Sequence, residues 1–325
     1  MKSLSQRAAI IVFCLLVVSH APVSAQSTSE ADALAGIKLA TNPTTKLAAA
    51  EDFVARFPRS NARLGVAQVI AEEILKIKNG SVALALLERA QAVFTAESER
   101  EILKPAALEA YVIGNRVDDA FALASEMLSK NPDDVGVLAR MTFAGSEEAR
   151  KKNRKYADVS LQYGLKAIAL CEEGKKPAAM SDEAWALQKP NLGQLYQQTA
   201  ILFLATNNTQ EAKTRLTKAC ALSPLDPANF ALLARVMNAD YLSQKDVYEA
   251  MPDGAAKQET LKALDAQLDS MIDTYARAAG LATGRPEYQT LLQQVIPDLT
   301  TYYKYRNNQS IKGLPELINR YRPRP

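Results

Sequence analysis

The sequence predicts an all-α protein built from stacked antiparallel helix pairs. The chain is rich in alanine and leucine, and aromatic residues make up only 6% of it. No stretch alternates apolar and polar residues for long enough to predict a strand. Several residues also recur at one fixed distance along the chain, which is typical of a repeat array. With 325 residues, the chain is long enough to build a long array of this kind.

The N-terminus has the pattern of a secretory signal. Lys2 and Arg7 are followed by the apolar run Ala8–Val18 and by the small residues of Val23–Ala25. This run is shorter than the ~20 residues that span a bilayer. We therefore expect a cleaved signal over residues 1–25. An uncleaved membrane anchor is the alternative. The exported protein would be periplasmic in a bacterium and secreted otherwise.

The predicted mature chain contains no histidine. The only histidine of the sequence, His20, lies in the signal, and loss of Lys2 and Arg7 reduces the net charge from +3 to about +1. Histidine-based nucleophile pairs and imidazole metal ligands are thereby excluded, and no glycine-rich phosphate loop is present. We expect no enzyme activity, cofactor or metal site. Nucleic acid is not expected as a partner, because phosphate binding needs a concentrated positive charge.

Apolar residues at helical spacing predict fourteen helices. Thr209 and Ser81 are expected to cap two of them. The predicted ranges are Ala31–Leu39, Lys46–Phe57, Ala62–Lys78, Val82–Phe94, Ser98–Gly114, Val117–Lys130, Val135–Arg150, Tyr156–Cys171, Leu192–Thr206, Thr209–Leu222, Ala228–Tyr241, Ala255–Gly280, Pro286–Tyr305 and Leu314–Tyr321.

An internal repeat explains the order of these helices. The residues Tyr111, Ala120 and Pro132 recur 92 residues later as Phe203, Ala212 and Pro224. A bulky aromatic residue on the first helix of a pair fits beside a small residue on the second, so the helix axes can approach closely. The proline then ends the second helix and directs the chain into the next pair.

The chain here resembles the tetratricopeptide repeat family, whose units are helix pairs of about 34 residues. The best match is Gly193–Asp226. Its matching residues are Tyr196, Ala200, Phe203, Ala212, Ala219 and Pro224. A second unit, Glu101–Asp134, departs from the pattern where Leu108 and Met127 replace small residues. The resemblance implies a right-handed α-solenoid over residues 26–250. Helices at 251–325 would form a C-terminal cap with a basic aromatic tail.

The resemblance also implies where a partner binds. In this family the first helices of the pairs line a groove that holds a protein or peptide. The corresponding positions are Gln194, Gln197, Ile201, Leu204 and Ala205 in the best unit, and Ile102, Glu109, Val112 and Ile113 in the other. The basic residues with which some members hold a terminal carboxylate are replaced, for example by Gln197 and Ile201. Alternatively, the groove positions pack against neighbouring helices.

An insertion at about 171–191 separates the two units. The 92-residue offset exceeds one unit plus one ordinary neighbour by about 24 residues. Trp185, the only tryptophan, lies in this insertion. It either fixes the loop onto the solenoid or binds a partner.

Other residues leave alternatives open. Cys171 and Cys220 are expected to be buried thiols, with a disulfide as the alternative. Carboxylate doublets such as Glu72-Glu73 and Glu147-Glu148 are expected on solvated helix faces, because adjacent helical residues diverge. A helical carbohydrate-active enzyme would need two converging carboxylates.

The C-terminal segment Thr301–Pro325 combines tyrosines with lysine and arginine. It either caps the last repeat or docks onto an acidic protein or an envelope surface. The sequence as a whole favours an exported, non-enzymatic scaffold that binds a protein or peptide. The alternatives are envelope binding through the tail and, less favoured, a helical carboxylate-dependent carbohydrate-active enzyme. Its oligomeric state is left open.

Overall fold

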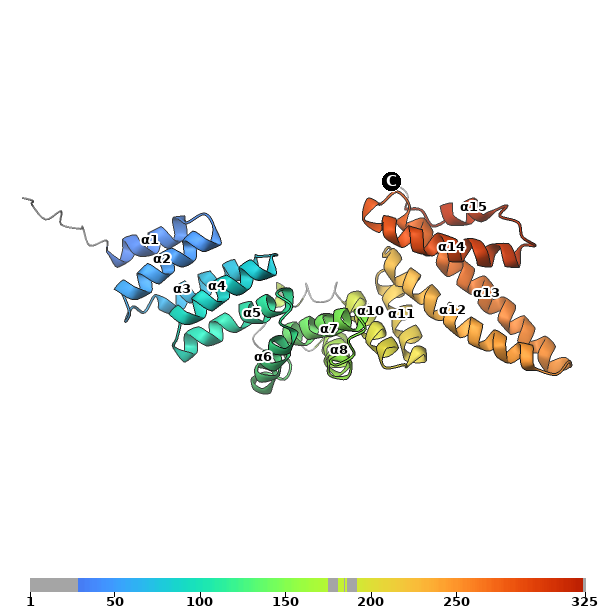
Figure 1. The fold of residues 1–325 in the computed structure, drawn as a ribbon, viewed down its shortest axis with the longest axis horizontal. Coiled ribbons are helices and arrows are strands. Elements are labelled where there is room, and N and C mark those ends of the chain that lie inside the picture. Colours follow the sequence, from blue (N-terminus) through green and yellow to red (C-terminus); the bar gives the residue numbers. More distant parts are fainter. Residues whose placement is uncertain (1–28, 175–180, 184, 186–191, 324–325) are drawn as a thin grey trace, which may run out of the picture.

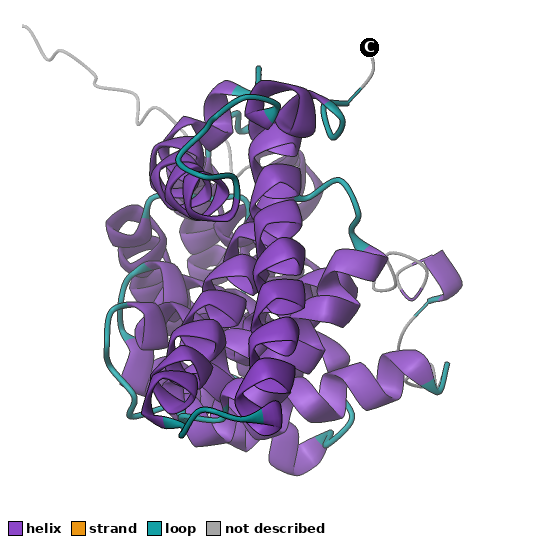
Figure 2. Ribbon diagram, turned by 90° about the vertical axis from the view of Figure 1, so that its right-hand side faces the viewer, coloured by secondary structure: helices purple, strands orange, loops and turns teal. Residues whose placement is uncertain are grey.

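The computed structural model describes residues 29–174, 181–183, 185 and 192–323. These residues form fourteen α-helices and one 3₁₀-helix, with no strand among them (Figures 1 and 2). The predicted all-α fold is confirmed. The elements are α1 (Glu30–Leu39), α2 (Pro43–Arg56), α3 (Arg63–Leu75), α4 (Gly80–Val93), α5 (Glu97–Ile113), α6 (Val117–Lys130), α7 (Val135–Arg150), α8 (Ala157–Glu172), α10 (Leu192–Ala205), α11 (Thr209–Leu222), α12 (Pro227–Ala250), α13 (Ala255–Ala282), η2 (Pro286–Tyr288), α14 (Gln289–Arg306) and α15 (Leu314–Asn319).

Neighbouring helices pack in pairs, and the pairs pack in a row. Helix α10 lies against α11, its partner, and also against α7 and α8 of the preceding pair. The same arrangement places α5 against α6 and against α3 and α4. The row runs along the longest axis of the molecule as a shallow arch, with α7 and α8 near its middle (Figure 1).

The small residues of the repeat allow the close packing expected for them. Ala212 and Ala219 are fully buried in α11. Ala212 joins the apolar cluster of Ala200 and Phe203, and Ala219 joins that of Tyr196. Helix α11 ends at Leu222, before Pro224, as the repeat pattern predicts.

Two glycines bring α7, α8 and α10 still closer together. A Cβ atom added at Gly164 of α8 would lie 2.5 Å from Thr199 Cγ2 of α10 and 2.8 Å from Thr142 Cγ2 of α7. One added at Gly145 of α7 would lie 1.8 Å from Ser160 Oγ of α8. Any side chain at these positions would therefore separate the helices at the centre of the arch.

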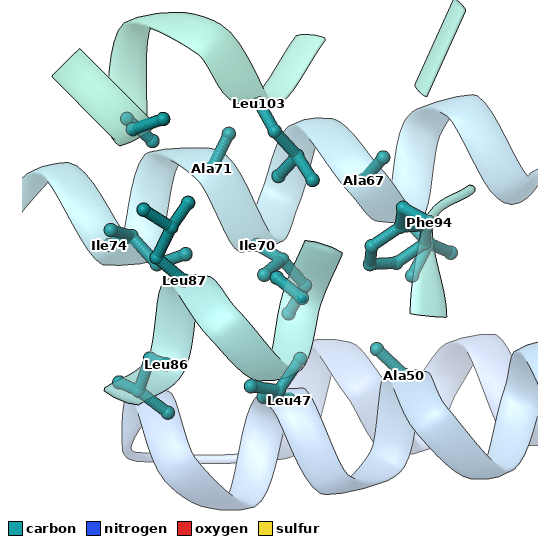
Figure 3. Packing of buried hydrophobic residues seen from close by; sticks show 14 of the residues in the cluster. Leu47, Ala50, Ala67, Ile70, Ala71, Ile74, Leu86, Leu87, Phe94 and Leu103 are labelled. Carbon is teal, nitrogen blue, oxygen red and sulfur yellow. The ribbon is translucent and has the colours of Figure 1, made fainter. Parts of the chain in front are cut away.

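Helices α2 to α5, in the N-terminal half of the row, share one apolar core. Leu47, Ile70, Leu87 and Leu103 are each almost completely buried in one continuous cluster (Figure 3). Phe94 closes one end of it and is fully buried (Figure 3). Because each helix contributes one apolar face, no single pair buries its core alone.

Two predicted helix caps are wrong by one or two residues. The N-cap of α4 is Asn79, whose Oδ1 accepts from Val82 N at 3.1 Å, and not Ser81. The N-cap of α11 is Asn208, which accepts from Glu211 N at 3.2 Å, so Thr209 is the first helical residue. An asparagine just outside the helix reaches the free amide of its first turn, whereas a residue within that turn does not.

The predicted end of α12 at Tyr241 is also wrong. The helix continues to Ala250 and contains 24 residues, and its partner α13 contains 28. No proline or glycine interrupts the chain between Tyr241 and Ala250. The expected boundary at 250–251 therefore falls in the turn of a long hairpin whose two arms share one apolar cluster.

The C-terminal helices cap this hairpin. Helix α15 packs on α13, and the Tyr321 hydroxyl after it donates to Asp273 Oδ1 at 2.5 Å. Tyr302 of α14 donates to Asn238 Oδ1 at 2.5 Å. Among the described residues, no helix is both long and apolar enough to cross a membrane. The predicted signal lies outside the described residues.

Candidate functional site

Three of the expected groove residues line one cavity. Ile201, Leu204 and Ala205 are at the C-terminal end of α10, and the cavity beside them has a volume of about 360 Å³. Ala149 of α7 forms its other apolar wall, and Lys152 and Arg154 complete it. We call this cavity, lined by Ala149, Lys152, Arg154, Ile201, Leu204 and Ala205, the basic groove. Gln194 is exposed and does not line it.

The cations of the basic groove come from the loop between α7 and α8. Helix α7 ends at Arg150, and Lys152 follows with a left-handed backbone (φ 67°). This conformation is uncommon for lysine and reverses the chain sharply. Neither Lys152 nor Arg154 forms an ion pair within the described part of the chain.

Buried and surface carboxylates hold this loop at both ends. Glu148 is 8% exposed and accepts from Lys151 Nζ and Asn153 Nδ2, each at 2.8 Å. These donors, Lys151 above all, hold the pKa of the Glu148 carboxyl below its usual value despite burial. At the other end, Lys155 and Tyr156 both donate to Asp118 of α6 and lower its pKa. The loop is thus fixed at its ends, and between them Lys152 and Arg154 form no ion pair with any described residue.

A ladder of neutral hydrogen bonds fixes the helices beneath the groove. Gln197 Nε2 donates to Asn229 Oδ1 of α12 at 2.7 Å. Gln198 Nε2 donates to Gln197 Oε1 at 3.1 Å, and Ser146 Oγ of α7 donates to Gln198 Oε1 at 2.7 Å. The Gln197 amide, expected to face a partner, is therefore bonded within the protein. It connects α7, α10 and α12 instead.

The expected groove residues of the earlier unit are spread over different surroundings. Glu109 of α5 accepts from Arg140 of α7 through both oxygens, at 2.5 and 3.2 Å. It lines a separate cavity of about 230 Å³ with Leu108. Val112 and Ile113 are half-buried against two different apolar clusters. These residues mainly join neighbouring helices, as the alternative interpretation expected.

Trp185 and most of the described C-terminal tail contact other parts of the protein. Trp185 is 8% exposed and belongs to an apolar cluster with residues of α7, α8, α10 and α11. In the tail, Arg306 forms a two-point ion pair with Asp269 of α13, at 2.8 and 3.1 Å. Tyr303 donates to the Lys312 carbonyl at 2.8 Å. Tyr305 remains 59% exposed.

The two cysteines are free and buried in different clusters. Burial raises the pKa of the Cys171 thiol and raises that of Cys220 to about 12, so neither is a ready nucleophile. Within the described ranges, no group of histidine, cysteine and carboxylate side chains could hold a metal ion.

Sequence reasoning did not identify Lys152 and Arg154. The available signal was the basic run 150–155 directly after a predicted helix. These positions lie between the two helices of a pair and match no position of the repeat, so the pattern gave them no role.

Comparison with known proteins adds little to this geometry. No family model matches the chain, and no curated protein matches it. Among solved structures, the chain is similar to a monomeric mutant of IFIT1 with m7Gppp-AAAA and to one with Gppp-AAAA. Each likeness has 15% identity and a TM-score of 0.41 and covers 86% of this chain. The chain spans 55% of the length of those IFIT1 chains.

Proposed function

We propose that this protein is an exported, divergent tetratricopeptide-type scaffold that binds a segment of another protein in the basic groove. The observation that carries the proposal is the pair of cations Lys152 and Arg154, which form no ion pair with a described residue, on the wall of an apolar cavity. A segment with an apolar side chain beside one or two carboxylates has the matching chemistry. Its apolar group would leave water, and its carboxylates would pair with the two cations.

The rigidity of the groove supports this role. Its volume of about 360 Å³ is within the range of pockets that take a small ligand or side chain, roughly 300–1,000 Å³. Glu148 and Asp118 fix the loop, and the Gln197–Asn229 bond fixes the helices. A groove that is already ordered loses little conformational entropy on binding.

The lining favours a protein over a nucleic acid. Its described residues include two cations and no aromatic ring, whereas single-stranded nucleic acids are held by stacked aromatic side chains along a longer basic track.

The carboxylate doublets support a non-enzymatic role. Hydrogen bonds from Lys46 and Lys76 lower the pKa of Glu73. The pKa values of Asp118 and Glu148 are lowered in the same way by the donors described above. A glycosidase acid needs the opposite shift, because it must stay protonated near neutral pH.

Crosslinking in the native host tests the proposal. Tagged full-length protein would be crosslinked and its partners identified by mass spectrometry. The test variant is Lys152→Glu with Arg154→Glu, and Ala205→Trp fills the cavity without changing charge. The matched control is Lys218→Glu with Lys262→Glu, which makes the same charge change at two exposed positions outside the groove.

A specific protein retained by wild type and the control, and lost from both groove variants, is the expected result. Equal recovery from all forms with unchanged helical content would overturn the basic groove as the binding site. Export has its own readout in the same preparation. We expect N-terminal sequencing of the purified protein to begin after Ala25.

A further inference from the structure

A second, larger cavity lies between α4, α5 and α6. It has a volume of about 550 Å³ and is lined by Leu103, Ala107, Ala122 and Leu123 together with Arg100 and Tyr111. A neighbouring cavity of about 510 Å³ also has Arg100 on its wall and continues past the N-terminus of α5. We call these two cavities together the outer groove. Its walls include the second helices α4 and α6, so it is distinct from the basic groove.

Most of the charged side chains of the outer groove form ion pairs with one another. Lys104 lies 2.5 Å from Glu101 and 2.6 Å from Glu126. Lys130 in turn pairs with Glu101 at 2.7 Å. Arg100 is exposed and has no carboxylate partner within the described part of the chain. Glu97, on the same wall, likewise forms no ion pair with a described residue. The groove therefore offers an apolar floor and, at its end, a guanidinium and a carboxylate that no described residue pairs.

The later pair α10–α11 shows what such a place can hold. Ninety-two residues after Leu103 lies Leu195 of α10, whose apolar cluster includes residues of the flanking helices α8 and α11. Trp185 belongs to that cluster and is 8% exposed. It stands on a short helical turn in which Trp185 N donates to the Ser181 carbonyl at 2.9 Å. In that repeat the chain supplies its own aromatic residue, while the corresponding surface of α5 borders an open cavity.

We propose that the outer groove binds a short helical segment of a partner protein. The segment inserts a large apolar or aromatic side chain over Leu103 and Ala107 and places a carboxylate against Arg100. The precedent of Trp185 argues for the helical turn and the large side chain. Arg100, which no described carboxylate pairs, argues for an acidic group beside it. The groove follows α5 from Arg100 to Tyr111, which at about 1.5 Å per residue accommodates roughly three helical turns. This site is independent of the basic groove.

Fragment binding tests the chemistry directly. The probe is indole-3-propionate, which joins an indole ring to a carboxylate, and its neutral control is indole-3-propanamide. Binding to the full-length protein would be followed by ligand-observed NMR titration. The variant Ala122→Trp fills the cavity from an exposed position, and Arg100→Gln removes the guanidinium. The matched control is Arg59→Gln, at an exposed arginine outside the groove.

We expect wild type and Arg59→Gln to bind the acid about tenfold more tightly than the amide. Arg100→Gln should remove this preference, and Ala122→Trp should abolish binding of both probes. Binding that survives Ala122→Trp but is lost in the Lys152→Glu, Arg154→Glu variant belongs to the basic groove and overturns the proposal. Absence of binding to wild type overturns it as well.

Peptide selection then tests the protein character of the occupant. A displayed library of 12-residue peptides would be selected on wild type and counter-selected on Ala122→Trp. Enrichment of sequences with an aromatic residue one turn from an acidic residue, and loss of their binding in Arg100→Gln, is the expected outcome. Failure to enrich any sequence above the counter-selected background contradicts a helical protein segment as the occupant.

Discussion

The helix pairs α5–α6 and α10–α11 occupy corresponding places in the repeat, 92 residues apart, but are packed differently. Ala200 and Ala219 of the later pair are fully buried. Their counterparts Leu108 and Met127 border a cavity of about 230 Å³, and the outer groove adjoins the same pair. Small residues thus bring two helices together, whereas larger ones leave spaces that other molecules can enter.

The two pairs also differ in their polar links to neighbouring helices. Helix α5 is tied by ion pairs, Glu99 to Arg63 of α3 and Glu109 to Arg140 of α7. Helix α10 is tied by the neutral bond between Gln197 and Asn229. In one case ion pairs join the repeat to its neighbours, and in the other close packing and a neutral hydrogen bond do so. We expect the stability of the two pairs to respond differently to mutation and to pH.

The largest expected effect comes from removing the ion pair between Glu99 of α5 and Arg63 of α3. Glu99 is 2% exposed, and its carboxylate accepts from Arg63 at 2.6 and 3.0 Å. Arg63→Met leaves this carboxylate buried without its partner, which costs about 3 kcal/mol of unfolding free energy. Urea denaturation would measure it. Arg59→Met, at an exposed neighbour, serves as the control and should change stability little.

The next largest effect comes from enlarging a buried small residue in the closely packed pair α10–α11. Ala219→Leu adds three carbon atoms at a fully buried position in α11 and should cost about 2 kcal/mol, because the helices must separate or distort. Ala221→Leu makes the same change at an exposed position of α11. Equal unfolding midpoints for the two variants in thermal denaturation would contradict close packing at Ala219.

Low pH should destabilise α5 more than α10. Arg63 holds the pKa of Glu99 below its usual value near 4.5, so the stabilisation is present above that pH and is lost as the pH falls below it. Between pH 6 and pH 3.5, hydrogen exchange corrected for its intrinsic pH dependence should show α5 losing more protection than α10. The Gln197–Asn229 bond does not titrate, so equal losses would contradict the distinction.

The smallest effect sharpens the comparison by restoring a small residue. Met127 is half-buried and borders a cavity, so Met127→Ala should cost about 1 kcal/mol or less. Ala219 and Met127 occupy the same repeat position. We therefore expect a larger loss of unfolding free energy from Ala219→Leu than from Met127→Ala. A loss above 3 kcal/mol in urea denaturation would show that α5–α6 is packed as closely as α10–α11.

The sequence predicted the helices well because helical periodicity is a local property. Val117–Lys130 and Thr209–Leu222 were predicted with the bounds that the structure has. The extension of α12 past Tyr241 was missed, since its outer part projects as a long hairpin that no repeat pattern describes.

The site was predictable only where the repeat register specified it. Ile201 and Ala205, which the repeat register assigns to a partner-binding groove, line the basic groove, and their contact with a partner stays a prediction. The partner of Gln197 lies 32 residues away on another helix, so spacing within one helix cannot reveal that bond. Lys152 and Arg154 were missed because they lie in a loop outside the repeat pattern.

The most direct test of the proposed scaffold is hydrogen exchange of the protein with and without its crosslink-identified partner. Binding in the basic groove predicts new protection confined to residues 149–156 and 201–206, and its absence in the Lys152→Glu, Arg154→Glu variant. Protection restricted to the tail residues 301–323, with none at the basic groove, would contradict the account and identify the tail as the binding element.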